Sequence, residues 1–252
     1  MRKISAMQRP LKTLERAFSK AGMGSRAEAT RWIRGGRVRV NGKVTRSPDT
    51  WVDLERDHIT LDQKPVRPGK KIYLLLYKPR GYLTTRSDPQ GRQTVYDLIG
   101  DVQQWVSPVG RLDQETSGLL VMTNDTQMAE RLTNPASSIP KTYQAKCATR
   151  LDEEQLERLR QGVQLKDGPT RPALVRRIRD SARHSVMELT ITEGRNRQVR
   201  RMIEAVDSKV LKLVRTAIGP IRIGQLGIGK HRPLSAAEVR LLMSEPRSAN
   251  RE

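Results

Sequence analysis

The amino-acid sequence predicts an α+β protein, in which a small domain of helices and a hairpin precedes a mixed, largely antiparallel sheet. Strand-like apolar segments outnumber amphipathic helices after residue 71. Strands and helices do not alternate regularly, as they would in a doubly wound fold. Near the N-terminus, two helical segments precede an Asn-Gly turn of hairpin type. We therefore divide the chain into a basic tail (1–10), a small domain (11–58), a linker (59–70), a large domain (71–243) and a C-terminal tail (244–252).

Helical spacing predicts the first two elements of the small domain. Apolar residues recur every three or four positions from Leu11 to Ala21, and two glycines then end the helix. Ser25 and Glu28 form a capping box, in which each side chain bonds the backbone of the other residue. A second, Arg-rich helix is therefore expected over about 26–34.

A hairpin is expected to follow these helices. Residues 37–44 alternate in polarity, and their Asn41-Gly42 step suits a type I′ turn. The following segment, 59–70, contains two prolines and a glycine, which is typical of a linker. The outward charge of the small domain is expected to come from Arg26, Arg31, Arg34, Arg37, Arg39 and Lys43.

The large domain is expected to open on a buried strand over the apolar run 72–77. Loops are expected at 78–81 and 87–92, where proline and glycine gather. Asp152 and Ser235 are plausible helix N-caps. Further strands are predicted near 117–123, 142–148, 186–192 and 209–215, and helices near 153–161, 197–206 and 236–243.

Net charge is the first indication of function. The 252 residues carry a formal charge of +21, and self-repulsion of that size favours a polyanionic partner. The excess lies in residues 1–70, with 17 basic against 7 acidic side chains, and in residues 171–232, with 15 against 5. The sequence has no apolar run long enough to span a membrane and no signal peptide, so we expect a cytoplasmic protein.

Cysteine and histidine are too scarce for a metal site. The single cysteine, Cys147, lies in an alternating segment of strand type, and an inert buried thiol is expected there. The three histidines are scattered and do not have zinc-ligand spacing. We therefore expect no metal and no cofactor.

The order of capped helices and Asn-Gly hairpin in residues 11–58 resembles the small RNA-binding domain named after ribosomal protein S4. The Ser25-Arg-Ala step and the run from Val38 to Lys43 carry this resemblance. Aromatic residues make up only 4% of the chain, so base stacking is not expected to dominate binding here. The resemblance implies contact with the phosphates of a folded RNA.

The segment Gly110-Arg-Leu-Asp-Gln-Glu-Thr-Ser-Gly-Leu-Leu120 is the clearest candidate site. Gly110 permits a tight turn, and an apolar strand begins near Leu119, so Asp113 is expected on a loop held between strands. By itself such an aspartate is more often a turn former. The segment resembles the signature of pseudouridine synthases, in the family that modifies uridines of 16S and 23S ribosomal RNA. The likeness extends to 78–81, 141–143 and 193–202.

This resemblance implies an RNA isomerase that needs no cofactor, in which Asp113 is the essential carboxylate. The uracil is cut from the ribose at N1 and rejoined through C5. Whether Asp113 first attacks the base, attacks the sugar or removes a proton stays open. By the same resemblance, Tyr143 stacks on the flipped base, while Arg111 contacts the flipped nucleotide or fills the space it leaves.

One arginine of the segment 195–206 is expected beside the carboxylate. Arg200 lies at the edge of an apolar helical stripe, so a half-buried guanidinium could keep Asp113 ionised, and the family pattern agrees. Arg197 and Arg201 are expected to bind phosphate. Where relatives often carry His before the Gln, this chain has Arg197, which leaves the role of that position open.

Two other functions fit parts of the sequence: a non-catalytic ribosomal RNA-binding assembly factor, and a duplex-DNA binder that uses 11–34 as a helix-turn-helix. The hairpin and the Asp113 segment disfavour the second. Residues 84–95 look more like the branch that acts on 23S than on 16S RNA. We expect a monomer that binds ribosomal RNA, or an assembling ribosomal subunit, away from membranes.

Overall fold

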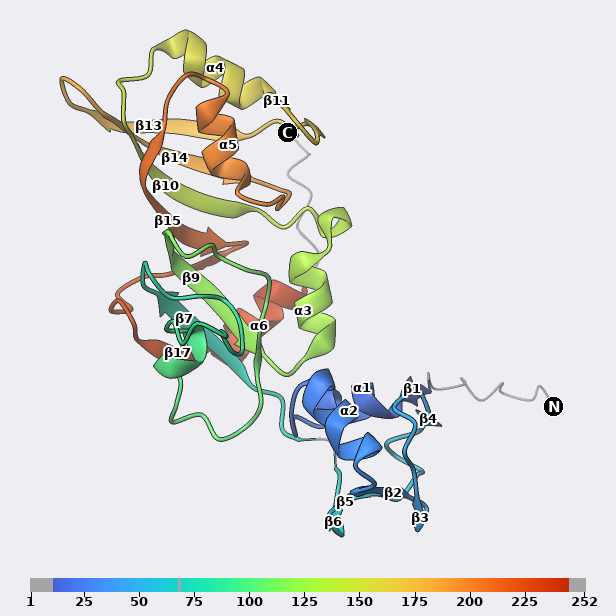
Figure 1. Cartoon of the computed structure of the whole chain (residues 1–252). Coiled ribbons are helices and arrows are strands. Elements are labelled where there is room, and N and C mark those ends of the chain that lie inside the picture. Colours follow the sequence, from blue (N-terminus) through green and yellow to red (C-terminus); the bar gives the residue numbers. More distant parts are fainter. Residues whose placement is uncertain (1–10, 68, 245–252) are drawn as a thin grey trace. The chain divides into compact units, whose positions relative to one another are not determined.

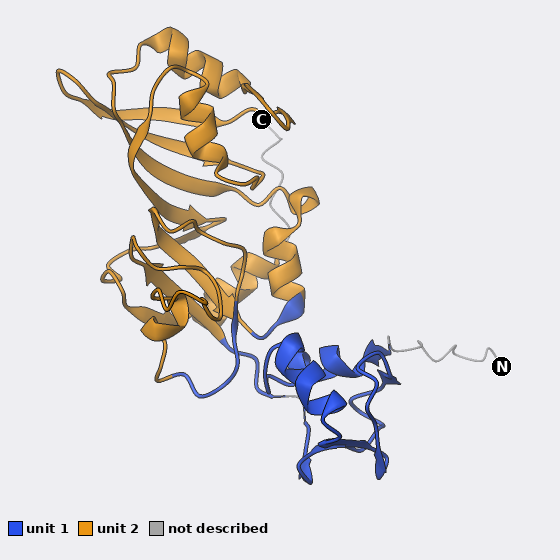
Figure 2. Ribbon diagram, viewed as in Figure 1, with its two compact units in different colours: residues 1–72, 102–107, 124–126 blue, residues 73–101, 108–123, 127–252 orange. Residues whose placement is uncertain are grey.

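The computed structural model describes residues 11–67 and 69–244 (Figure 1). The expected basic tail, 1–10, lies outside these residues, as does the C-terminal tail beyond Ser244. The chain divides into two compact units (Figure 2). The N-terminal unit comprises residues 1–72 with the short segments 102–107 and 124–126, and the large unit comprises the rest.

The N-terminal unit contains the two helices and the hairpin that were expected. α1 (Leu14–Lys20) begins three residues later than Leu11, which is exposed. α2 (Arg26–Arg34) has the full Ser25–Glu28 capping box. β2 (Val38–Val40) and β3 (Lys43–Val44) pair across Asn41 and Gly42, whose φ angles of 52° and 81° are those of a type I′ turn. A buried apolar core joins these elements.

The expected linker over 59–70 is wrong for its first half. β5 (Ile59–Leu61) and β6 (Lys64–Pro65) extend the hairpin to a four-stranded sheet of order β3-β2-β5-β6. Ile59 and Val66 are buried in the core of this unit. A second small sheet pairs β1 (Lys12–Thr13) with β4 (Trp51–Val52).

A mixed, largely antiparallel sheet organises the large unit, as expected. Its main path runs β13-β14-β10-β15-β9-β7-β17, and of the neighbouring strands along this path only β15 and β9 pair in parallel. Two short strands, β8 (Ser107–Pro108) and β16 (Ile221–Arg222), attach to β9 and β15. The path strands are β7 (Tyr73–Lys78), β9 (Thr116–Thr123), β10 (Lys141–Cys147), β13 (Leu174–Asp180), β14 (Ser185–Ile191), β15 (Val210–Ile218) and β17 (His231–Pro233).

Helices cover two parts of this sheet. α4 (Glu153–Gln161) and α5 (Gln198–Glu204) lie on one face of β10, β14 and β15, where their apolar residues form one core with the strands (Figure 1). α3 (Thr126–Thr133) and α6 (Ala236–Met243) contribute to a second core with β7 and β9. The Asp152 and Ser235 caps are present. The remaining elements are η1 (Val95–Leu98), η2 (Pro135–Ser137), β11 (Gln164–Leu165) and β12 (Gly168–Pro169).

Candidate active site

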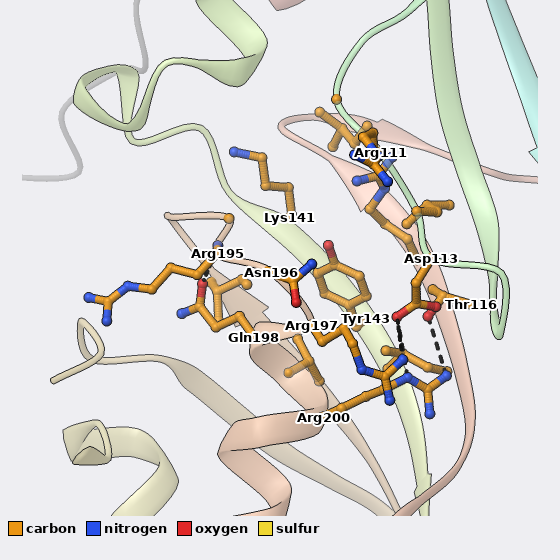
Figure 3. Close-up of a pocket in the computed structure, with 18 of the residues that line it drawn as sticks. Arg111, Asp113, Thr116, Lys141, Tyr143, Arg195, Asn196, Arg197, Gln198 and Arg200 are labelled. Carbon is orange, nitrogen blue, oxygen red and sulfur yellow. Dashed lines mark hydrogen bonds and ion pairs between the residues drawn. The ribbon is translucent and has the colours of Figure 1, made fainter. Parts of the chain in front are cut away.

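A pocket of about 360 Å³ opens in the large unit where β9, β10 and β15 meet the start of α5. Asp113, Tyr143, Arg111, Arg197 and Arg200 all line it (Figure 3). The sequence assigned four of these residues to one site, although Arg111 and Arg200 are separated by about 90 positions, and it assigned Arg197 to phosphate. The structure brings all five together. Among the described residues, no group of three or more His, Cys, Asp or Glu side chains could hold a metal ion.

The loop that carries Asp113 is held by its backbone. Gly110 has a φ of 72°, which permits the turn after β8, and β9 begins at Thr116. The Nζ of Lys78 donates to the carbonyl oxygens of Asp113 at 3.1 Å and of Thr116 at 2.8 Å. The Thr84 hydroxyl bonds the carbonyl of Leu112 at 2.7 Å. These contacts fix the backbone on both sides of the carboxylate, so Asp113 is held in place before any substrate binds.

Lys78 begins one of the segments that carry the family likeness, 78–81, but it was not predicted to be part of the site. Its side chain is fully buried at the end of β7, and burial lowers its pKa to about 8. The negative charge of Asp113 opposes this lowering of the pKa. A lysine directly after the apolar run 72–77 and before a proline is the only sequence signal for it.

Two arginines share one oxygen of Asp113. The Nε of Arg200 and the Nη1 of Arg197 each lie 3.4 Å from Oδ2 (Figure 3). The other oxygen, Oδ1, is buried and has no hydrogen-bond partner among the described residues. One oxygen is thus neutralised from two sides, while the second is buried without a partner.

The two guanidinium groups differ in how firmly they are held. Arg200 is buried rather than half-buried, and its Nη2 also donates to the carbonyl of Glu115 at 3.0 Å. The side chain of Arg197 is 45% exposed. Arg200 therefore supports both the carboxylate and its loop, whereas Arg197 can leave Asp113 without breaking the core.

The predicted bounds of the α5 segment need correction, and the two arginines expected to bind phosphate both have partners within the protein. The helix was expected over 197–206, but Arg197 is its N-cap, in the left-handed region with a φ of 47°. That backbone turn aims Arg197 at Asp113. Arg201, also expected to bind phosphate, instead donates to both carboxylate oxygens of Asp167, at 2.7 and 3.1 Å. This ion pair joins α5 to the turn between β11 and β12.

Tyr143 and Arg111 occupy different parts of the pocket. Tyr143 is half-buried on β10, where it packs on the core under α5 and presents its ring to the pocket. Arg111 is exposed and precedes Asp113 by two residues. Lys141 and Arg215 also line the pocket, although the sequence did not indicate them as site residues.

The basic residues predicted in the N-terminal unit are all exposed. Among them, Arg31, Arg34 and Lys43 have no ion-pair partner in the part of the chain that the structure describes. Arg26 pairs with Glu15, and Arg37 pairs with Asp62. Arg39 bonds the carbonyl of Gly42 within the hairpin. Their contact with RNA stays a prediction.

Comparisons with known proteins agree with this geometry. A family profile described as RNA pseudouridylate synthase matches residues 72–205, and one described as S4 domain matches residues 18–57. A protein of Aquifex aeolicus (strain VF5), described as an uncharacterized RNA pseudouridine synthase, is 42% identical over 90% of this chain and 91% of its own length. Ribosomal large subunit pseudouridine synthase B of Bacillus subtilis (strain 168) is 38% identical, over 92% of this chain and 96% of its own.

One solved structure supports the same assignment of fold. It is the crystal structure of a pseudouridylate synthase, which matches with a TM-score of 0.66 and 30% identity. The match covers 92% of this chain and 99% of that one. Both units therefore have their counterparts in a single known protein.

Proposed function

The chain belongs to the RNA pseudouridine synthase family and carries an S4 domain, and we propose that it isomerises a specific uridine of ribosomal RNA, with 23S favoured over 16S. Asp113 is the essential carboxylate. The observation that carries this proposal is its placement: one oxygen faces two guanidinium groups and the other has no partner, in a pocket that also holds the ring of Tyr143.

Three features support ribosomal RNA as the substrate. The formal charge of +21 suits a long phosphate-bearing partner. The S4 domain exposes basic side chains on α2 and on the hairpin. Relatives from Bacillus subtilis and Yersinia pestis, 38% and 37% identical, are named for the large ribosomal subunit. A 23S uridine, on naked RNA or on an assembling subunit, is therefore the proposed target.

The pocket can perform the isomerisation with its own side chains. The target uridine turns out of its helix, and its base stacks on Tyr143. Arg200 holds the carboxylate of Asp113 in place beside the nucleoside. Arg111 contacts the flipped nucleotide at the rim of the pocket. Arg197, whose side chain is partly exposed, can release Asp113 and bind a phosphate of the RNA instead. One glycosidic bond is exchanged for a carbon–carbon bond, so the chemistry consumes no external energy.

Mapping pseudouridine in ribosomal RNA tests the proposal. Unmodified 23S and 16S RNA, made by transcription, are incubated separately with the purified full chain, and pseudouridines are located by chemical labelling. We expect one new site, or a small set, in 23S RNA. Modification in 16S RNA alone would overturn the assignment to the large subunit. RNA binding without any modification, on naked RNA and on subunit particles alike, would instead favour an assembly factor.

A further inference from the structure

Another arginine of the pocket wall, Arg215, has no counter-ion among the described residues. It is 5% exposed on β15, and its Nε donates to the carbonyl of Leu119 at 2.7 Å. Its Nη2 is buried and has no hydrogen-bond partner in the part of the chain that the structure describes. No carboxylate of the described residues forms an ion pair with it. Burying such a group without a partner is strongly unfavourable, so a ligand that completes the site is expected.

The sheet register places Arg215 beside Tyr143. Their Cα atoms are partners in the antiparallel pair β10–β15, so both side chains leave the same face of the sheet. On its other side Arg215 is the partner of Gly118 in β9. Gly118 has a φ of 116°, and a Cβ there would lie 2.2 Å from the carbonyl oxygen of Arg215, so only glycine fits. Tyr143 and Arg215 thus start from adjacent positions on one face of the sheet, and both line the pocket, with the guanidinium of Arg215 held toward β9 by its bond to Leu119.

The surrounding charge also indicates an electron-rich ligand. Lys141 lines the same pocket, and its pKa is lowered by burial and then by the charge of Arg215. Lys78 bonds the backbone of the Asp113 loop, and the charge of Arg215 also contributes to lowering the pKa of Lys78. Asp113 is the only carboxylate in the pocket wall, and it is already shared by two arginines. Positive charge at the Arg215 end is therefore not neutralised by the protein.

We propose that Arg215 is a catalytic residue that donates an N–H to a carbonyl oxygen of the bound uracil and stabilises the negative charge that develops on the base. This inference rests on the proposed function. The proposed contact is to the base, whereas Arg200 acts on the carboxylate of Asp113.

Negative charge reaches the uracil oxygens by each route open to Asp113. If Asp113 attacks the sugar or removes a sugar proton, the C1′–N1 bond breaks and its electron pair leaves with the base, spread over N1, O2 and O4. If Asp113 adds to the base, the pair of the attacked double bond moves toward O4. In each route the C1′–N1 bond breaks, C5 bonds to C1′ and loses its proton, and N1 gains a proton. Asp113 gives up its bond to the sugar or base, or returns the sugar proton, so the composition is unchanged. A fixed, buried guanidinium at a uracil oxygen lowers the barrier in all three cases.

Substitution of Arg215 combined with a change in the base tests this role. Single-turnover rates are measured for the full-length wild type, Arg215→Met and Arg215→Lys on a ribosomal RNA fragment that contains the target. The same RNA with 5-fluorouridine at the target is the second substrate, because fluorine itself stabilises negative charge on the base. Fluorine cannot leave C5 as a proton does, so the rate measured on this RNA is the rate at which the N1-linked fluorouridine is consumed. Arg176→Met is the matched control, since Arg176 is exposed on β13 and pairs with Glu188.

We expect Arg215→Met to slow the conversion of uridine about 100-fold, the usual effect of removing one such donor. The RNA dissociation constant should stay within a few-fold, and Arg215→Lys should recover part of the rate. The loss should be clearly smaller with 5-fluorouridine, and Arg176→Met should match the wild type. An unchanged rate in Arg215→Met, or equal losses on both substrates, would overturn the inference. If the wild type itself makes no pseudouridine, the proposed function fails instead.

Discussion

The Nε of Arg200 lies 3.4 Å from Oδ2 of Asp113, and the same guanidinium bonds the backbone of the Asp113 loop at Glu115. One side chain from α5 therefore controls both the charge and the position of the carboxylate. Its side chain is only 10% exposed, so water does not replace these contacts if they are lost.

Arg200→Met should destabilise the protein far more than Arg197→Met. Removing one partner of a buried pair leaves the other charge uncompensated and costs about 3 kcal/mol, whereas a pair with an exposed partner contributes about 0–1 kcal/mol. The free energy of unfolding of both variants can be measured by urea denaturation. Equal losses would show that the two arginines hold Asp113 alike.

Lys78→Met should remove a rise in stability at alkaline pH. The pKa of Lys78 is about 8 in the folded protein and 10.5 in the unfolded chain, so between these values the unfolded chain binds more protons. Stability therefore increases with pH across this window, by up to about 3 kcal/mol. The difference in unfolding free energy between wild type and Lys78→Met should grow from pH 8 to 10.5. The difference isolates Lys78 from Lys20, whose pKa is also about 8. A difference in unfolding free energy that stays constant from pH 8 to 10.5 would contradict a lowered pKa of Lys78.

Tyr143→Leu should weaken RNA binding about tenfold, while Tyr143→Phe should not. A stacked base contributes about 1–3 kcal/mol, and phenylalanine keeps the aromatic face. Dissociation constants are best compared in the Asp113→Asn background, where turnover does not intervene. If the leucine variant binds as tightly as the phenylalanine variant, the base does not stack on this ring.

Cys147 should be unreactive in the native protein. Its thiol is buried in the core under α4 and α5, and burial raises its pKa to about 12. Iodoacetamide at pH 8 should label it only after denaturation, as mass spectrometry can show. Rapid labelling of the folded protein would mean that this core opens.

Local patterns predicted most of the fold, while contacts between distant segments escaped them. The Ser25 capping box and the strands of the large unit depend on spacings within a few residues, and they agree with the structure. The linker was predicted over 59–70 from its two prolines and a glycine, because two short strands with a proline have little periodicity. Only their pairing with β2 makes them a sheet.

In the candidate site too, local motifs identified some residues, and residues whose role depends on distant contacts were missed. Asp113, Tyr143 and Arg200 were named from their motifs, and the structure places them in one pocket. Lys78 and Arg215 were not assigned roles, because a buried cation can be recognised only when the strands around it are paired. The ion pair of Arg201 with Asp167 was not predicted, because Asp167 lies 34 residues away and shares no pattern with it.

The most direct test of the account is the pseudouridine content of target RNA after incubation with Asp113→Asn, measured beside the RNA dissociation constant. Asparagine keeps the size of the side chain but cannot act as a carboxylate nucleophile or base. We predict that the variant binds ribosomal RNA as tightly as the wild type within a few-fold, and forms no detectable pseudouridine. Pseudouridine formed by Asp113→Asn at the wild-type rate would contradict the central role of this residue.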